Sequence, residues 1–188
     1  MNISIVIPVY NSGPILKDLV VRLKVVLSQY YDSFELILVN DGSRDDSWEI
    51  IGALVNEYTW IRGINLMRNY GQHNALLCGI RNARFEVIVT MDDDLQHPPE
   101  ELPKLTDKLA EGFDVVYGPP LHQQHGLWRD LASLLTKTSL QATIGVETAR
   151  LVSAFRAFRA EVRKAFDDYR GSFVSIDVLL TWGTTRFG

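Results

Sequence analysis

Cysteine is nearly absent from this sequence, since Cys78 is the only one among 188 residues, and no disulfide can form within the chain. Long apolar runs are missing too: no stretch approaches the roughly 20 apolar residues that a membrane-spanning helix needs. The N-terminus has no basic leader, and its apolar run is interrupted at Pro8, which argues against a signal peptide. We therefore expect a soluble domain that faces the cytoplasm.

Proline and glycine are also scarce, with 7 and 13 residues, and charged residues make up 22% of the chain, which excludes collagen-like and disordered classes. Hydrophobic residues at 46% are enough for one sizeable core, so we expect a single domain over residues 1–188. The net charge of -4 argues against general nucleic-acid binding. Residues 121–188 nevertheless carry nine Lys/Arg against six Asp/Glu, or +3, which leaves -7 for residues 1–120. This imbalance suits a metal site followed by a surface for an anionic partner, or simply ordinary solvated faces.

Short apolar runs rich in β-branched residues alternate with segments of helical periodicity. We expect strands at 3–9, 34–39, 61–66, 87–91 and 113–117. We expect helices after residue 12 up to about 27, at about 45–58, at 74–84, from 97 onward, and at 127–141, 159–168 and 173–182. The pattern predicts an α/β fold with a mostly parallel sheet, helices on both faces and a helical C-terminal part. Residues 1–120 would carry the ligand-binding part and residues 121–188 the helical part.

Polar residues follow three of the predicted strands, at positions 10–13, 40–43 and 92–97. In an open α/β sheet, ligands bind at the carboxyl ends of the strands. The sequence therefore predicts one site to which all three segments contribute.

Three consecutive carboxylates, Asp92, Asp93 and Asp94, come directly after a buried-strand pattern. Carboxylates this close repel one another unless a cation lies among them. Asp92 and Asp94 would point the same way if the strand continued, and a few hard oxygen ligands suit Mg²⁺ or Mn²⁺. The alternative is a solvated acidic turn that only ends the strand, and we favour the metal site.

No glycine-rich phosphate loop is present, which argues against a dinucleotide enzyme or a P-loop ATPase and leaves the phosphates to the metal. Asp41 fits either a plain turn or a carboxylate that accepts hydrogen bonds from a base or ribose. The polar cluster 68–73 fits a loop and helix cap. For Arg129 and Arg156 a solvated helix face is the ordinary explanation.

Four segments together resemble the family-2 glycosyltransferases, which have the Rossmann-like GT-A fold. They are Ile-Pro-Val-Tyr-Asn at 7–11, Asn-Asp-Gly-Ser at 40–43, Arg-Asn-Tyr-Gly-Gln-His at 68–73, and residues 91–101 with Asp-x-Asp-Leu-Gln and Pro-Pro-Glu. The third is similar to a segment of undecaprenyl-phosphate aminoarabinose transferases, and the fourth is shared with dolichol-phosphate mannosyltransferases. The resemblance covers nearly the whole chain and points to the polyprenyl-phosphate branch.

The resemblance implies a role for each matching residue. The nucleotide pocket would include Pro8, Tyr10, Asn11, Asp41, Arg68, Gln72 and Asp93, with Asp41 at the base and Asp93 near the ribose or sugar. The metal, Mg²⁺ or Mn²⁺, would be held by Asp92, Asp94 and Gln96. The catalytic set would be Asp92, Asp94, Arg129 and Arg156, with the two arginines and the stretch 153–156 near the phosphates and the acceptor.

The implied activity is inverting transfer of a sugar from a nucleotide sugar, with UDP favoured, to a polyprenyl phosphate such as undecaprenyl phosphate. It implies a cytoplasmic location at the inner face of the membrane, with peripheral membrane contact. Alternatives are a family-2 enzyme that acts on a saccharide hydroxyl, a nucleotide-sugar-binding module without turnover, and a nucleotidyltransferase. Two features depart from the family: Ser12 replaces a frequent Glu, and residues 118–121 lack a frequent Arg. Relatives continue into membrane helices, which we expect this chain to lack.

Overall fold

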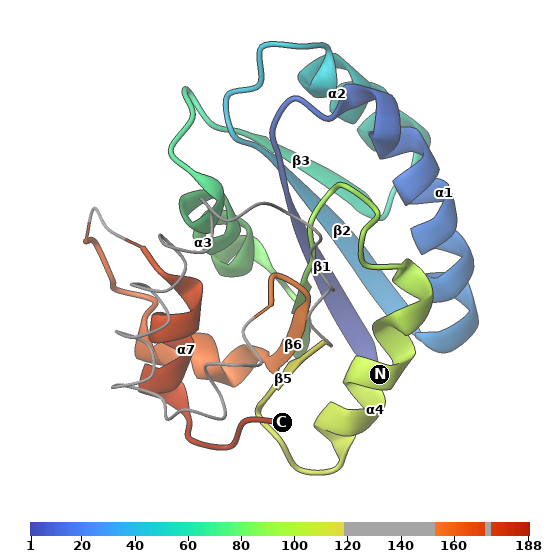
Figure 1. Ribbon diagram of the computed structural model, residues 1–188. Coiled ribbons are helices and arrows are strands. Elements are labelled where there is room, and N and C mark those ends of the chain that lie inside the picture. Colours follow the sequence, from blue (N-terminus) through green and yellow to red (C-terminus); the bar gives the residue numbers. More distant parts are fainter. Residues whose placement is uncertain (119–152, 172–173) are drawn as a thin grey trace, which may run out of the picture.

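The computed structural model describes residues 1–118, 153–171 and 174–188, in which a six-stranded sheet separates two layers of helices (Figure 1). In chain order the elements are β1 (Asn2–Val9), α1 (Gly13–Tyr30), β2 (Ser33–Asn40), α2 (Ser47–Glu57), β3 (Ile61–Asn65), α3 (Gln72–Asn82), β4 (Val87–Thr90), the 3₁₀ turn η1 (Pro99–Glu101), α4 (Leu102–Ala110), β5 (Val115–Tyr117), β6 (Arg156–Arg159), the 3₁₀ turn η2 (Ala160–Ala165) and α7 (Ile176–Gly183).

The sheet has the strand order β3-β2-β1-β4-β6-β5. β3, β2, β1 and β4 are parallel, whereas β6 runs antiparallel to both of its neighbours, β4 and β5. The four parallel strands put their carboxyl ends at one edge of the sheet, which is where the polar segments of the sequence lie.

Alternate residues of β1 supply the two halves of the core. Ile5 belongs to the same core cluster as Leu23, on the side of α1, α2 and α4, whereas Val6 belongs to the same cluster as Leu76, on the side of α3 and α7 (Figure 1). Gly79 permits close packing on this second side, because a Cβ there would lie 2.3 Å from Val6 Cγ1. The β-branched runs are thus buried on both faces, as strands of a covered parallel sheet should be.

The predicted α/β fold, with a mostly parallel sheet and helices on both faces, is confirmed. The helix predicted at 159–168 is wrong, because Arg159 ends β6 and residues 160–165 form 3₁₀ turns. The sequence of β6 gave no strand signal, because its first three residues are all buried. It therefore lacks the alternation of apolar and polar residues by which a half-exposed strand is recognised in a sequence. The helix predicted at 173–182 corresponds to α7, and the one at 127–141 lies outside the described residues.

Within the part of the chain that the structure describes, no helix is long and apolar enough to cross a membrane. The division into residues 1–120 and 121–188 stays a prediction.

Candidate functional site

A cavity of about 330 Å³ opens at the carboxyl ends of β1, β2 and β4. Its lining residues are Pro8, Val9, Tyr10, Asp41, Asn69, Gly71, Gln72, Asp92, Asp93 and Asp94. All four segments singled out in the sequence contribute to this wall. Among the residues expected in the nucleotide pocket, Asn11 and Arg68 lie outside the lining.

Asn11 joins the first polar segment to the second. Its backbone N–H donates to Ser43 Oγ at 3.0 Å, and its side-chain Oδ1 accepts from the Arg44 backbone N–H at 2.7 Å. Asn11 has a φ of 54°, a left-handed conformation that asparagine tolerates better than most residues. The side chain and backbone of Asn11 therefore link the loop after β1 to the loop after β2, next to the cavity-lining residues Tyr10 and Asp41.

Asp41 anchors the segment 68–71. Only 2% of Asp41 is exposed; its Oδ1 accepts from the Tyr70 backbone N–H at 2.7 Å and its Oδ2 from that of Gly71 at 2.9 Å. Gly42 allows this close approach, because it has a φ of 66° and a Cβ there would lie 2.5 Å from the backbone of Arg68 and Asn69. The Arg68 guanidinium is exposed and lies 4.8 Å from the centre of the Tyr70 ring.

The three aspartates stand on the loop after β4. The strand ends at Thr90, so strand alternation does not place Asp92 and Asp94 on one side; the loop brings all three carboxylates to the cavity. Gln72 Nε2 donates to Asp92 Oδ1 at 2.6 Å, and the Tyr10 backbone N–H donates to Asp93 Oδ2 at 3.4 Å.

The loop continues through a strained residue to Gln96. Leu95 has a φ of 58°, a conformation rarely adopted by leucine and found mostly where a site requires it. The Gln96 backbone N–H donates to Asp94 Oδ1 at 3.0 Å, which fixes the orientation of that carboxylate. The Gln96 side chain is exposed and lies outside the lining of the cavity.

The pKa of Asp92 is raised to about 6, mainly by burial and in addition by the neighbouring charges of Asp94 and Asp93, whereas Arg156 acts in the opposite direction. Burial also raises the pKa of Asp93. Two carboxyl groups are therefore held where their charged forms are poorly solvated. A cation in the cavity would relieve this electrostatic cost.

The chemistry of the donor set allows a test of the metal prediction. Within the described residues, no group of three or more His, Cys, Asp or Glu side chains could by itself hold a metal ion. Mg²⁺ and Mn²⁺ commonly need only one or two protein carboxylates, because waters and substrate phosphates complete their coordination. Asp92 and Asp94, facing one open cavity, fit that mode of binding.

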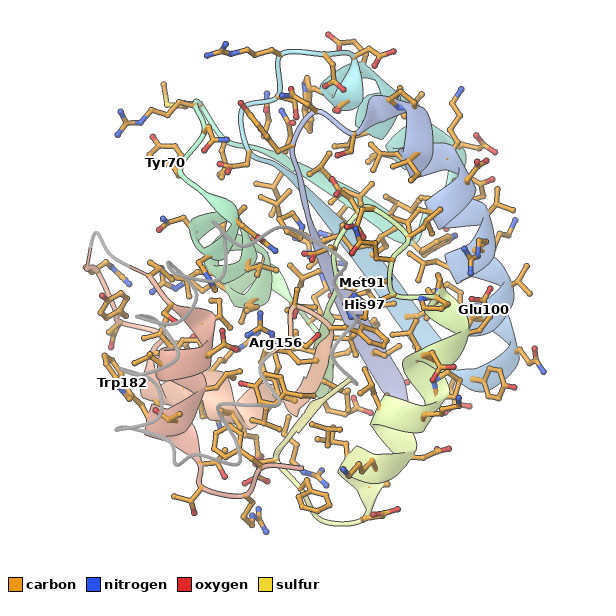
Figure 2. The ribbon with its side chains drawn as sticks, in the orientation of Figure 1. Tyr70, Met91, His97, Glu100, Arg156 and Trp182 are labelled. Atoms are coloured by element: carbon orange, nitrogen blue, oxygen red, sulfur yellow. The ribbon has the colours of Figure 1, made fainter. Side chains whose placement is uncertain are left out.

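Arg156 is not on a solvated helix. It stands on β6 with 2% of its surface exposed (Figure 2), and it lines a cavity together with His73 of α3 and Asp177 of α7. Its Nη1 is in contact with Asp177 Oδ1 in a buried ion pair, and its Nε donates to Thr90 Oγ1 at 3.0 Å. Arg129, the other predicted acceptor-side arginine, lies outside the described residues.

A second cavity of about 170 Å³ lies next to the first and shares Gln72 with it. Its lining residues are Gln72, His73, Ser153, Ala154, Arg156 and Asp177. Asp177 also accepts a hydrogen bond from Tyr117 Oη at 3.0 Å. Asp177 was not predicted as a site residue, although a lone charge within the apolar run 176–180 is a signal for a buried partner.

The comparisons with known proteins agree with this geometry. Residues 4–166 match the family model described as Glycosyl transferase family 2. The chain belongs to glycosyl transferase family 2.

Two relatives support the branch of family 2 that the sequence motifs indicate. The undecaprenyl-phosphate 4-deoxy-4-formamido-L-arabinose transferase of Shewanella sediminis is 40% identical over 177 residues, which are 93% of this chain and 54% of that protein. The enzyme of the same name from Pseudomonas aeruginosa is 37% identical over 164 residues, which are 87% and 48% of the two chains. The chain thus spans about half the length of the curated relatives it matches. The resemblance to the aminoarabinose-transferase branch is confirmed.

Solved structures confirm the GT-A fold of this family-2 chain. One is the glucosyl-3-phosphoglycerate synthase from Mycobacterium tuberculosis, solved in complex with Mn²⁺, uridine diphosphate and glucosyl-3-phosphoglycerate. Its TM-score is 0.70 at 21% identity, over 99% of this chain and 68% of that one. The other is Staphylococcus aureus TarS, with a TM-score of 0.66 at 18% identity over 100% and 57% of the two chains. At these identities the likeness shows the fold alone.

Proposed function

We propose that this chain transfers a sugar, with inversion, from a nucleotide sugar to a polyprenyl phosphate at the cytoplasmic face of a membrane. The observation that carries the proposal is the pair of adjoining cavities. The first is lined by Asp92 and Asp94, whose surroundings favour a bound cation, and the second is lined by the Arg156–Asp177 ion pair. Relatives named as undecaprenyl-phosphate transferases support undecaprenyl phosphate as the acceptor.

The donor belongs in the first cavity. Pro8 and Tyr10 of β1 and its loop would line the nucleotide, Asp41 would accept a hydrogen bond from the base, and Asp93 would face the ribose or sugar. Asp41 keeps acceptor capacity for this, because each carboxylate oxygen accepts more than one hydrogen bond. UDP is the favoured nucleotide, in line with the uridine diphosphate bound in the structural neighbour. Arg68 and Asn11, which are not among the lining residues, would contribute only if the donor extends beyond the lining.

Asp92 and Asp94 would hold Mg²⁺ or Mn²⁺, and Gln96 would join them only after its exposed side chain turned toward the cavity. When bound, such an ion supplies positive charge next to the diphosphate, on which negative charge grows as the nucleotide departs. The protein holds the carboxylates ready for this: Gln72 orients Asp92, and the Gln96 backbone orients Asp94.

The acceptor belongs in the second cavity. Among the described residues that line it, Asp177 is the one carboxylate, and its charge is balanced by Arg156. A hydroxyl acceptor would need a carboxylate free to act as a general base. A phosphate monoester is already anionic near pH 7 and needs none, so the arrangement favours a lipid phosphate over a saccharide hydroxyl. Displacement of the nucleotide by a phosphate oxygen at the anomeric carbon inverts its configuration.

The test combines donor binding with transfer. Thermal shifts with UDP-, GDP- and dTDP-sugars, with and without Mn²⁺, identify the nucleotide. UDP-4-deoxy-4-formamido-L-arabinose, carrying a labelled sugar, is then incubated with the chain, Mn²⁺ and a short-chain polyprenyl phosphate. We expect label in the lipid fraction, and we expect Asp94→Asn to abolish its formation. Asp107→Asn, which alters an exposed aspartate of α4, is the matched control.

Three outcomes would contradict the proposal in different ways. Transfer of label to a saccharide instead of the lipid would favour the hydroxyl-acceptor enzyme. Donor binding without transfer or hydrolysis would favour a binding module. Release of pyrophosphate would indicate a nucleotidyltransferase.

A further inference from the structure

His97 is a buried side chain to which the proposed function gives no task. It lies on the loop between β4 and η1, three residues after Asp94, and 8% of it is exposed (Figure 2). Its ring packs against Phe155 with 5.0 Å between the ring centres. Its Nε2 lies 3.4 Å from Ser153 Oγ, whereas its Nδ1 has no hydrogen-bond partner among the described residues.

The unpartnered nitrogen indicates which tautomer is present. If Nδ1 carried the proton, a buried N–H donor would be left without an acceptor, and such orphaned donors are rare in proteins. With the proton on Nε2, every ring N–H has a partner, and Nδ1 is an unpaired acceptor. We therefore assign the Nε2–H tautomer, in which His97 donates to Ser153 Oγ.

This tautomer determines what Ser153 can do. The Phe155 backbone N–H also donates to Ser153 Oγ, at 3.2 Å. Two donors then occupy both acceptor positions of the hydroxyl oxygen, so the Ser153 O–H is left as a donor only. Ser153 lines the second cavity beside Arg156, and a hydroxyl that must donate suits an anionic ligand there.

We propose that His97 is a positioning residue that turns the Ser153 hydroxyl toward the phosphate of the acceptor. His97 connects the aspartate loop of the first cavity to the 153–156 stretch of the second, so it also keeps the two cavities in register. The inference rests on the proposed function for the identity of the anion. His97 itself lines neither cavity.

Three substitutions of His97 separate its hydrogen bond from its packing. His97→Gln carries an amide nitrogen that reaches about as far from the backbone as Nε2. His97→Asn carries the same group but reaches only as far as Nδ1. His97→Phe keeps a ring against Phe155 but has no hydrogen-bond donor. It replaces the asparagine variant in the comparison if that variant does not fold. Ser153→Ala and the double variant H97F/S153A complete a double-mutant cycle.

The main measurement is calorimetric affinity for farnesyl phosphate in the presence of UDP and Mn²⁺. We expect affinity about tenfold weaker in S153A, H97F and H97N, the loss typical of one hydrogen bond to a charged group. H97Q should stay within about twofold of the wild type, and the double variant should be no weaker than S153A alone. UDP affinity should be the same in all variants. In the transfer assay, the KM for the lipid phosphate should rise while kcat changes little.

Wild-type affinity in H97F, additive losses in the double variant, or an H97Q as weak as H97F would overturn the inference. So would a wild-type chain that does not bind farnesyl phosphate. A wild-type chain that binds farnesyl phosphate but transfers no sugar to it would contradict the proposed function alone, because the affinity measurement does not require turnover.

Discussion

Arg156 of β6 and Asp177 of α7 form an ion pair in which both side chains are almost completely buried. The pair links α7 to three strands of the sheet, because Arg156 of β6 also donates a hydrogen bond to Thr90 of β4 and Asp177 accepts one from Tyr117 of β5. Burying two charges is favourable only when each is compensated by the other and by further hydrogen bonds. Both conditions are met, so the guanidinium is held rigidly at the wall of the second cavity.

Replacing one member of the Arg156–Asp177 pair should lower the free energy of unfolding far more than replacing both. Arg156→Met leaves the Asp177 charge buried and unpaired, which should lower the free energy of unfolding by about 3–5 kcal/mol. The double variant R156M/D177L should be clearly more stable than R156M in urea unfolding. Arg170→Met, at an exposed arginine, should change stability by less than about 0.5 kcal/mol. A double variant as unstable as R156M would contradict this account.

The same double variant tests the acceptor role of Arg156. If it folds, we expect UDP affinity to be preserved and transfer to the lipid phosphate to be lost, because the cation at the second cavity is gone. Unchanged transfer would assign Arg156 to structure alone.

The local residue pattern was sufficient to predict the parallel strands and the loop that carries Asp92, Asp93 and Asp94. β1, β2 and β4 are rich in apolar, β-branched residues, and each is followed directly by polar residues, so both the strand and its functional end could be identified. Three consecutive carboxylates after a buried strand are electrostatically costly without a role, which made Asp92 and its neighbours visible. These signals are contained within a few residues of sequence.

What the sequence could not reveal depends on partners far apart in the chain. The charge of Arg156 suggested a solvated helix face, and its compensating partner Asp177 lies 21 residues later. Asn11 belongs to the family motif, yet its contacts are with Ser43 and Arg44, on a loop that only the folded sheet brings close. Likewise, the unpartnered nitrogen of His97 becomes apparent only once its surroundings are known.

Asp41 should support both the fold and the nucleotide. In Asp41→Asn, one side-chain oxygen becomes an NH₂ group facing a backbone N–H of Tyr70 or Gly71, so one buried hydrogen bond is lost. We expect the free energy of unfolding to fall by about 1–3 kcal/mol. The same variant should bind UDP more weakly than the wild type does. This loss should exceed the loss of affinity for inorganic pyrophosphate with Mn²⁺, because the contact to the base is lost and the contact to the metal is not. Asp46→Asn, at a nearby exposed aspartate, is the control. Equal weakening of both ligands would argue against a role at the base, as would tighter binding of GDP than of UDP.

Asp92 should destabilise the metal-free protein at neutral pH. Its pKa is raised from 3.8 to about 6, so between these values the folded chain holds a proton that the unfolded chain has released. Wild-type stability through this group therefore falls as the pH rises toward 6 and stays low above it. Asp92→Asn should raise the free energy of unfolding at pH 7 by about 1–3 kcal/mol, and the gain should vanish near pH 4. Urea unfolding in EDTA at both pH values measures this. A loss of stability at pH 7 would show that Asp92 is not held at such a cost.

The same carboxyl should make metal-dependent donor binding sensitive to pH. A divalent ion binds the ionised form of Asp92, so a proton competes with the metal below a pKa of about 6. Affinity for a UDP-sugar with Mn²⁺ should therefore rise by about tenfold per pH unit well below 6 and level off near 7. A UDP-sugar is the right ligand, because its diphosphate has no proton to lose in this range.

In Asp94→Asn a neighbouring negative charge is gone, so the midpoint of any remaining metal-dependent binding should move to lower pH. Asp92→Asn should bind weakly with no such slope. Calorimetric titrations between pH 5 and 7.5, repeated in EDTA, decide the matter: a flat profile in the wild type, or an equal slope in Asp92→Asn, would place the titrating group elsewhere.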